Sequence, residues 1–175
     1  DEQVRPYTFN LAPFLQDRMA IQQGFLSSEP YAAREAGANP KVFLIADAGY
    51  ENYQTTINIS RRMVTEKKEL VQRFVDATVE GWTQYMRKQD IAAANALIMR
   101  DNPEMTQDKI DYAIEEMNRM GIVLSGDAET LGIGAMTHAR WDRFYATMVA
   151  AGVYPAGMAI RNAYSLDFVN RRVGL

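Results

Sequence analysis

The pattern of apolar and polar residues changes character near residue 60. Before that point, four short apolar runs bounded by turn residues predict β-strands: residues 4–9, 25–28, 41–45 and 55–60. The last run alternates Ile57 and Ile59 with polar residues, which is the period of a half-buried strand. Proline and glycine residues bound two short predicted helices, at residues 14–23 and 30–36. The first part of the chain therefore predicts an α/β layer.

Beyond residue 60 the spacing is helical. Residues 65–87 carry apolar side chains three and four positions apart, which predicts one long helix with Thr65 as its N-cap. We expect it to be the longest helix, with four side chains buried: Phe74, Val75, Val79 and Trp82. Further helices are predicted at residues 90–99, 106–120 and 137–151, with a short one from Ser165. Gly121 and Gly152 mark the ends of two of them.

Four strands are few for so many helices, because helices need a sheet or each other to cover their apolar faces. We therefore expect an α/β protein of which this chain is an incomplete portion, mostly helical after residue 60. Sequence upstream of these 175 residues is expected to supply the missing strands.

Composition narrows the classes of function. The 19 basic and 22 acidic residues are scattered along the chain and leave a net charge of −3, which argues against a nucleic-acid partner. The chain lacks cysteine, and His138 is the only histidine, so we expect no metal ligands, no catalytic residues and no cofactor. The expectation is that the protein is not an enzyme.

Two polar segments are candidates for binding a ligand. Ser28 and Glu29 follow the 25–28 strand directly and precede Pro30, and the carboxyl ends of strands are where α/β sheets form ligand crevices. An ordinary strand-to-helix cap is the open alternative. Tyr50 and Tyr53 lie in a polar loop after the 41–45 strand, and their rings suit a small planar solute. Surface tyrosines in a turn are the alternative there.

Longer stretches of the chain resemble a known family, the NMT1/THI5-like solute-binding proteins of ABC importers for nitrate, sulfonates, taurine and thiamine-type pyrimidines. The resemblance covers nearly the whole chain and is carried by these segments: residues 5–15 (RPYTFNLAPFL), 20–24 (AIQQG), 28–31 (SEPY), 70–77 (LVQRFVDA) and 81–82 (GW).

The resemblance implies a type II periplasmic binding protein fold, in which two α/β lobes close on a ligand by hinge bending. Residues 1–45 would be the C-terminal part of the second lobe. Residues 46–175 would be the hinge crossing and the C-terminal helical part of the first lobe. It also implies a periplasmic or lipid-anchored extracytoplasmic location and ABC permease subunits as partners, with a full-length protein that is monomeric.

By the same resemblance, ligand contacts are expected at Ser28, Glu29 and Tyr50, and the chemistry of the tyrosine loop adds Tyr53. A buried Glu29 carboxylate favours a donor-rich aminopyrimidine over nitrate, a sulfonate or taurine. The carboxylate would repel a negatively charged solute group, and two buried negative charges without a positive partner are costly. Two alternatives remain open: an enzyme of the same fold that resembles the pyrimidine-precursor synthases, and a ligand-sensing domain.

Overall fold

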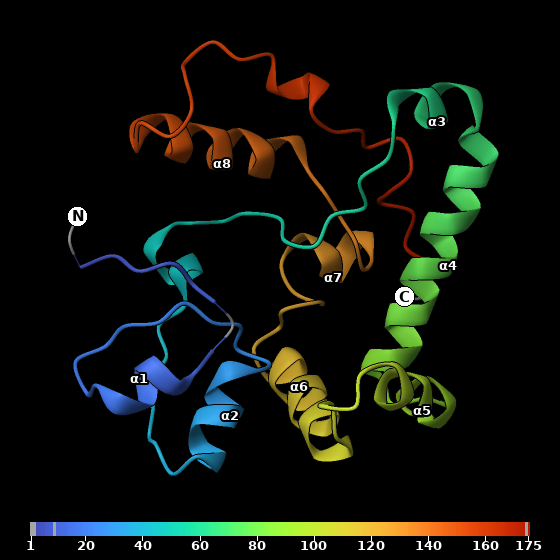
Figure 1. Ribbon diagram of the computed structural model, residues 1–175. Coiled ribbons are helices and arrows are strands. Elements are labelled where there is room, and N and C mark those ends of the chain that lie inside the picture. Colours follow the sequence, from blue (N-terminus) through green and yellow to red (C-terminus); the bar gives the residue numbers. More distant parts are fainter. Residues whose placement is uncertain (1–2, 9, 174) are drawn as a thin grey trace. The chain divides into compact units, whose positions relative to one another are not determined.

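The computed structural model of the protein describes residues 3–8, 10–173 and 175, and their regular structure is helical (Figure 1). The helices in chain order are α1 (Ala12–Gln16), α2 (Glu29–Glu35), the 3-10 helix η1 (Ile45–Ala48), α3 (Arg61–Glu66), α4 (Lys68–Met86), α5 (Ala92–Asp101), α6 (Gln107–Arg119), α7 (Asp127–Leu131), α8 (His138–Ala150) and the 3-10 helix η2 (Ile160–Asn162). None of these helices is both long and apolar enough to cross a membrane.

The chain divides into two compact units, each made of two stretches of sequence. Unit 1 comprises Asp1–Val42 and Ala92–Met120, and unit 2 comprises Phe43–Ile91 and Gly121–Leu175. The boundary predicted near residue 45 refers to the two lobes of a complete binding-protein fold, and it stays a prediction.

The core of unit 1 is formed where α2 meets α6. Ala33 is 1% exposed, and Ile110 and Ile114, one helical turn apart on α6, are 4% and 0% exposed. α6 begins after Thr106, as predicted, and ends before Gly121, whose φ of +62° belongs to the left-handed region that favours glycine. The prediction for this helix is therefore confirmed within one residue at each end.

The core of unit 2 lies between α4 and the C-terminal segment. Val71, Val75 and Val79 on α4 pack with Phe168, and all four side chains are buried. Gln72 fixes the segment by donating from Nε2 to the Phe168 carbonyl at 3.1 Å. This core positions α4 against residues 168–173.

The prediction for the longest helix is confirmed in part. α4 has 19 residues and buries Val75 and Val79. The burial of Phe74 and Trp82 is wrong, because these side chains are 59% and 39% exposed. The edge of one ring meets the other between Trp82 and Tyr85, with 6.4 Å between the ring centres, and Phe74 is left largely exposed.

The start of that helix also differs from the prediction. Thr65 is not an N-cap, because it lies inside the separate helix α3. The helices are interrupted at Lys67, whose φ and ψ of −126° and 38° are not helical. Ser60 caps α3, and its hydroxyl accepts a hydrogen bond from the Met63 N–H at 3.3 Å.

The predicted strands do not form in the part of the chain that the structure describes. Residues 25–28 are a turn before α2, residues 41–45 lead into η1, and residues 55–60 have no regular structure. Phe9, at the end of the 4–9 prediction, lies outside the described residues. A strand is stable only when neighbouring strands pair with its backbone, and no such neighbour is present here. The α/β class is therefore not confirmed, whereas the helical second part is.

The remaining helices follow the sequence with shifted ends. α2, α5 and α8 match their predictions, and Thr137 caps α8 by accepting a hydrogen bond from the Arg140 N–H at 3.3 Å. α1 is shorter than predicted and ends at Gln16. α7 was not predicted, and the short helix expected from Ser165 does not form among the described residues; η2 lies upstream of it.

Candidate ligand-binding site

Glu29 is the first residue of α2, and the turn before the helix holds its side chain. Its Oε2 accepts a hydrogen bond from the Phe25 N–H at 2.7 Å, and its Oε1 accepts one from the Tyr7 hydroxyl. Gly24 leaves room for this arrangement, since a Cβ there would lie 2.9 Å from the Glu29 Cβ. Both carboxylate oxygens therefore have partners inside unit 1.

The Glu29 carboxylate changes the acidity of its partner. The hydrogen bond to Glu29 raises the pKa of Tyr7 to about 12, because a phenolate could not donate it and would be repelled by the carboxylate. Tyr7 thus stays protonated across the physiological range and holds Glu29 in place.

Ser28 is exposed, and its hydroxyl makes no capping hydrogen bond to α2. Its backbone carbonyl instead accepts from the N–H groups of Tyr31 and Ala32, at 3.1 and 3.2 Å. The hydroxyl is therefore a polar group that can contact a ligand, while the backbone starts the helix.

A second pair of tyrosines joins α2 to α6 next to this turn. The rings of Tyr31 and Tyr112 lie 5.0 Å apart, and the Tyr31 hydroxyl donates to Asp108. This hydrogen bond raises the pKa of Tyr31 to about 12. The Tyr112 hydroxyl donates to the Leu26 carbonyl at 3.3 Å. These contacts tie the Ser28–Glu29 turn to the core of unit 1.

In unit 2, the loop of residues 50–53 is fastened to α8 by an arginine. Arg140 donates to the backbone carbonyls of Glu51 and Asn52, at 3.3 and 3.0 Å, and its guanidinium lies 4.5 Å from the centre of the Tyr53 ring. Arg143 adds a 3.0 Å ion pair with the Glu51 carboxylate. The loop is thus held mainly through its backbone.

The aromatic side chains of this loop belong to a larger group on α8. The Trp141 ring is stacked on the Tyr164 ring, with 4.7 Å between the ring centres and 8° between the ring planes. It also contacts the Tyr53 ring in a tilted arrangement, with 5.3 Å between the ring centres. Tyr50 meets the edge of Phe144 at 5.7 Å. We call these residues the ring cluster: Tyr50, Tyr53, Trp141, Phe144 and Tyr164.

Polar atoms are sparse within the ring cluster. The Tyr53 hydroxyl accepts from the Thr137 N–H at 2.8 Å, which leaves its own proton free to donate. The Trp141 Nε1 is buried and has no hydrogen-bond partner among the described residues. Such a donor is costly to leave unpaired, so it marks a place where an acceptor would bind favourably.

His138 lies at the edge of the same cluster. Its Nδ1 is 2.6 Å from the Tyr164 hydroxyl, so the imidazole serves to orient that ring. Within the described residues, no three His, Asp or Glu side chains come together in a way that could hold a metal ion.

The four candidate residues fall into two pairs. Ser28 and Glu29 adjoin each other in unit 1, and Tyr50 and Tyr53 pack against α8 in unit 2. The sequence reading missed Trp141 and Phe144, the partners of those tyrosines. The sequence shows two aromatic residues three positions apart next to Arg140, but no local feature links α8 to a loop about 90 residues away.

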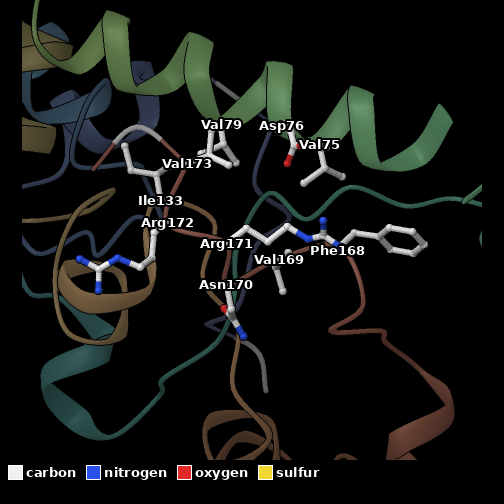
Figure 2. Close-up of a pocket in the computed structure, with 10 residues that line it drawn as sticks. All are labelled: Val75, Asp76, Val79, Ile133, Phe168, Val169, Asn170, Arg171, Arg172 and Val173. Carbon is white, nitrogen blue, oxygen red and sulfur yellow. The ribbon is translucent and has the colours of Figure 1, made fainter. Parts of the chain in front are cut away.

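A cavity between α4 and the C-terminal segment is too small to bind a solute. Figure 2 shows Val75 and Val79 on α4 facing residues 168–173 across it. Its volume of about 10 Å³ has room for one water molecule. Asn170 closes the segment against the chain before α8, since its side-chain amide pairs with both the N–H and the carbonyl of Met136 at 3.1 and 2.8 Å.

Comparison with known proteins supports the class of solute-binding proteins. The riboflavin-binding protein RibY of Chloroflexus aurantiacus is 23% identical to this chain over 159 residues. The match covers 90% of the chain and 44% of RibY, so the chain spans less than half the length of this relative. No solved structure matches the chain.

The family can be stated more narrowly. The family model described as NMT1/THI5 like matches residues 2–92, which is more than half of the chain. The chain belongs to this family, and the predicted resemblance is confirmed. The family implies a periplasmic binding protein fold, although the described residues contain no strand that would establish the α/β class.

Proposed function

We propose that this protein is the solute-binding component of an ABC importer, which captures a small planar, polar solute and delivers it to a membrane permease. The family supports a binding protein of this kind, and a relative is named for binding riboflavin. The observation that carries the proposal is the ring cluster around Tyr50 and Tyr53.

The ring cluster suits a planar solute because it is organised before the solute arrives. Arg140 holds the backbone of the 50–53 loop in place, so little conformational entropy remains to be lost on binding. An offset or edge-to-face contact between aromatic rings contributes about 0.5–1.5 kcal/mol beyond the burial of area. A heterocycle would gain such contacts, whereas nitrate, taurine or an aliphatic sulfonate has no ring.

The solute class is therefore a nitrogen heterocycle, with a thiamine-precursor-like pyrimidine and a flavin as the two leading candidates. The pyrimidine follows from the family resemblance, and the flavin follows from the relative's name. In the described structure, each carboxylate oxygen of Glu29 already accepts one hydrogen bond, so only its remaining lone pairs are open to a solute. The preference for a ring thus rests on the aromatic residues.

Location and partners complete the proposal. A protein that delivers solute to a permease works outside the cytoplasmic membrane, either in the periplasm or attached by a lipid anchor. Its partners are the solute and the permease subunits, and the full-length form acts as a monomer.

Native mass spectrometry of the full-length protein, purified without denaturation, tests this function. We expect a co-purified adduct whose mass and ultraviolet spectrum identify a heterocycle. The absence of any adduct, together with no calorimetric binding of riboflavin, an aminopyrimidine, taurine or nitrate, would contradict the proposal. A bound heterocycle that leaves the protein chemically changed would favour the enzyme alternative instead.

A further inference from the structure

The Tyr53 hydroxyl is an unused hydrogen-bond donor within the ring cluster. Its oxygen accepts a hydrogen bond from the Thr137 N–H at 2.8 Å. A tyrosine hydroxyl can accept one hydrogen bond and donate another, and the accepted bond restricts the directions in which the proton can point. That proton has no acceptor among the described residues, and the Tyr53 side chain is only partly buried. Tyr53 can therefore donate to a solute that lies against the rings.

The N–H that binds this hydroxyl is held in place by its surroundings. The Thr137 hydroxyl donates to Asp127 Oδ2 at 2.9 Å and accepts from the Arg140 N–H at 3.3 Å. The preceding residue, Met136, pairs through its N–H and carbonyl with the side-chain amide of Asn170, at 3.1 and 2.8 Å. Figure 2 shows Asn170 on the C-terminal segment, with its amide turned away from α4. The direction of the donor is thus fixed before a solute binds, which lowers the entropic cost of binding.

Two neighbouring groups also favour a hydrogen-bond acceptor on the solute. The Trp141 ring contacts the Tyr53 ring, and its buried Nε1–H has no partner among the described residues. The Arg140 guanidinium lies 4.5 Å from the centre of the Tyr53 ring and donates to two backbone carbonyls. In the part of the chain that the structure describes, no carboxylate forms an ion pair with it. An electron-rich oxygen on the solute would satisfy the donors and interact favourably with this charge.

We propose that the Tyr53 hydroxyl selects the solute by donating to a ring carbonyl, and that the solute class is a pyrimidinedione, either free or as the terminal ring of a flavin. This inference rests on the proposed function and chooses between its two leading candidates. An aminopyrimidine presents N–H donors at the positions where a dione presents oxygens. Those donors would face unpaired O–H and N–H groups and the positive charge of Arg140, so they would lack acceptors.

Calorimetric titration of the full-length protein separates this inference from the function on which it rests. The ligands are thymine and riboflavin, which both carry the dione, and the diamine analogue of thymine, in which amino groups replace both ring carbonyls. We expect the wild type to bind at least one dione about tenfold or more tightly than the diamine. Equal or tighter binding of the diamine would overturn this inference and leave the proposed function intact. Binding of none of the three would overturn both.

Tyr53→Phe tests whether this hydroxyl is the donor, because it removes the hydroxyl and keeps the ring. We expect the affinity for the dione to fall about three- to tenfold, as for the loss of one hydrogen bond, and the affinity for the diamine to stay within about twofold. The change also leaves the Thr137 N–H without its acceptor, so the ratio of the two affinities is the readout. A purely structural role would lower both affinities equally, and that result would overturn the proposal.

Tyr145→Phe is the matched control. The Tyr145 hydroxyl also accepts from one backbone N–H, that of Met158, and donates to the Pro155 carbonyl, both at 2.8 Å. Its loss should leave the ratio of affinities unchanged.

Infrared difference spectroscopy of the bound dione, with isotope-labelled carbonyls, gives a second readout that a purely structural role would not change. A hydrogen bond lowers the stretching frequency of a carbonyl. The carbonyl band should therefore lie at a higher frequency in Tyr53→Phe than in the wild type or in Tyr145→Phe. The same frequency in all three proteins would overturn the proposal.

Discussion

The Glu29 turn and the 50–53 loop were both predicted as ligand contacts, but the two segments are held in opposite ways. In the turn, the Glu29 side chain itself fastens the structure by accepting hydrogen bonds from Tyr7 and Phe25. In the loop, Arg140 on α8 binds the backbone carbonyls. A loop held by its backbone keeps its side chains for recognition. This difference makes the loop the stronger candidate for contact with a solute.

The largest effect is expected at Trp141, the ring that joins the loop to α8. Trp141→Ala removes contacts with Tyr53, Phe144 and Tyr164 together and should cost about 3–5 kcal/mol in the free energy of unfolding. Urea unfolding measures this cost. Trp82→Ala is the control within residues 1–175, since its 39% exposed ring should cost about 1 kcal/mol. Equal costs would mean that Trp141 does not organise the loop.

Arg140→Met tests how the loop is fastened. Methionine keeps much of the length of the side chain but cannot donate to the carbonyls of Glu51 and Asn52. Hydrogen bonds from a charged group contribute about 1.5–3 kcal/mol, so we expect a loss of roughly 2 kcal/mol and faster amide exchange at residues 50–53. Arg143→Met is the matched control: its ion pair is largely exposed, and its loss should cost about 0.5 kcal/mol. Unchanged amide exchange at residues 50–53 in Arg140→Met would show that Arg140 does not hold the loop in place.

Glu29→Gln is expected to have a smaller effect, and on stability rather than affinity. An amide accepts hydrogen bonds only at its oxygen, so Tyr7 or the Phe25 N–H would lose its acceptor. We expect a loss of about 1–2 kcal/mol in unfolding free energy, with solute affinity unchanged. An affinity reduced about tenfold at constant stability would instead place Glu29 against the solute, as the sequence first suggested.

The smallest effect concerns tyrosine ionisation at high pH. Hydrogen bonds to Glu29 and Asp108 raise the pKa values of Tyr7 and Tyr31 from 10.0 to about 12. The stabilisation from these bonds is complete below pH 10, the pKa of the unfolded state, and is lost as the pH rises through about 12. Phenolate absorbance should show a late-titrating component that becomes smaller in Tyr7→Phe and also in Tyr31→Phe. Ordinary titration of all nine tyrosines would contradict these hydrogen bonds.

The helices could be predicted because their signals are local. Thr106 and Thr137 precede α6 and α8, Gly121 follows α6 with one residue between, and the apolar spacing in each helix is that of one buried stripe. The prediction for α4 was partly wrong because its apolar residues cover more than one face of the helix. Spacing alone does not show what packs against each apolar side chain, so Val75 and Val79 were placed correctly and Phe74 and Trp82 were not.

The strands and the ring cluster depend on contacts that are distant in sequence. Ile57 and Ile59 have the alternation of a strand, but a strand forms only beside a partner, and none is described here. The loop tyrosines were identified from their chemistry, whereas Trp141 became visible only when α8 was brought to the 50–53 loop. Local sequence therefore indicated the chemistry of the site better than its assembly.

Calorimetric titration of the full-length protein and its Tyr50→Ala variant with riboflavin and an aminopyrimidine tests most directly whether the ring cluster binds the solute. Tyr145→Phe, a change on the same helix that spares the ring cluster, is the control. We expect the wild type and the control to bind one heterocycle with similar affinity, and Tyr50→Ala to bind it about tenfold more weakly. Affinity unchanged in Tyr50→Ala, for every ligand that the wild type binds, would contradict a solute site at the ring cluster.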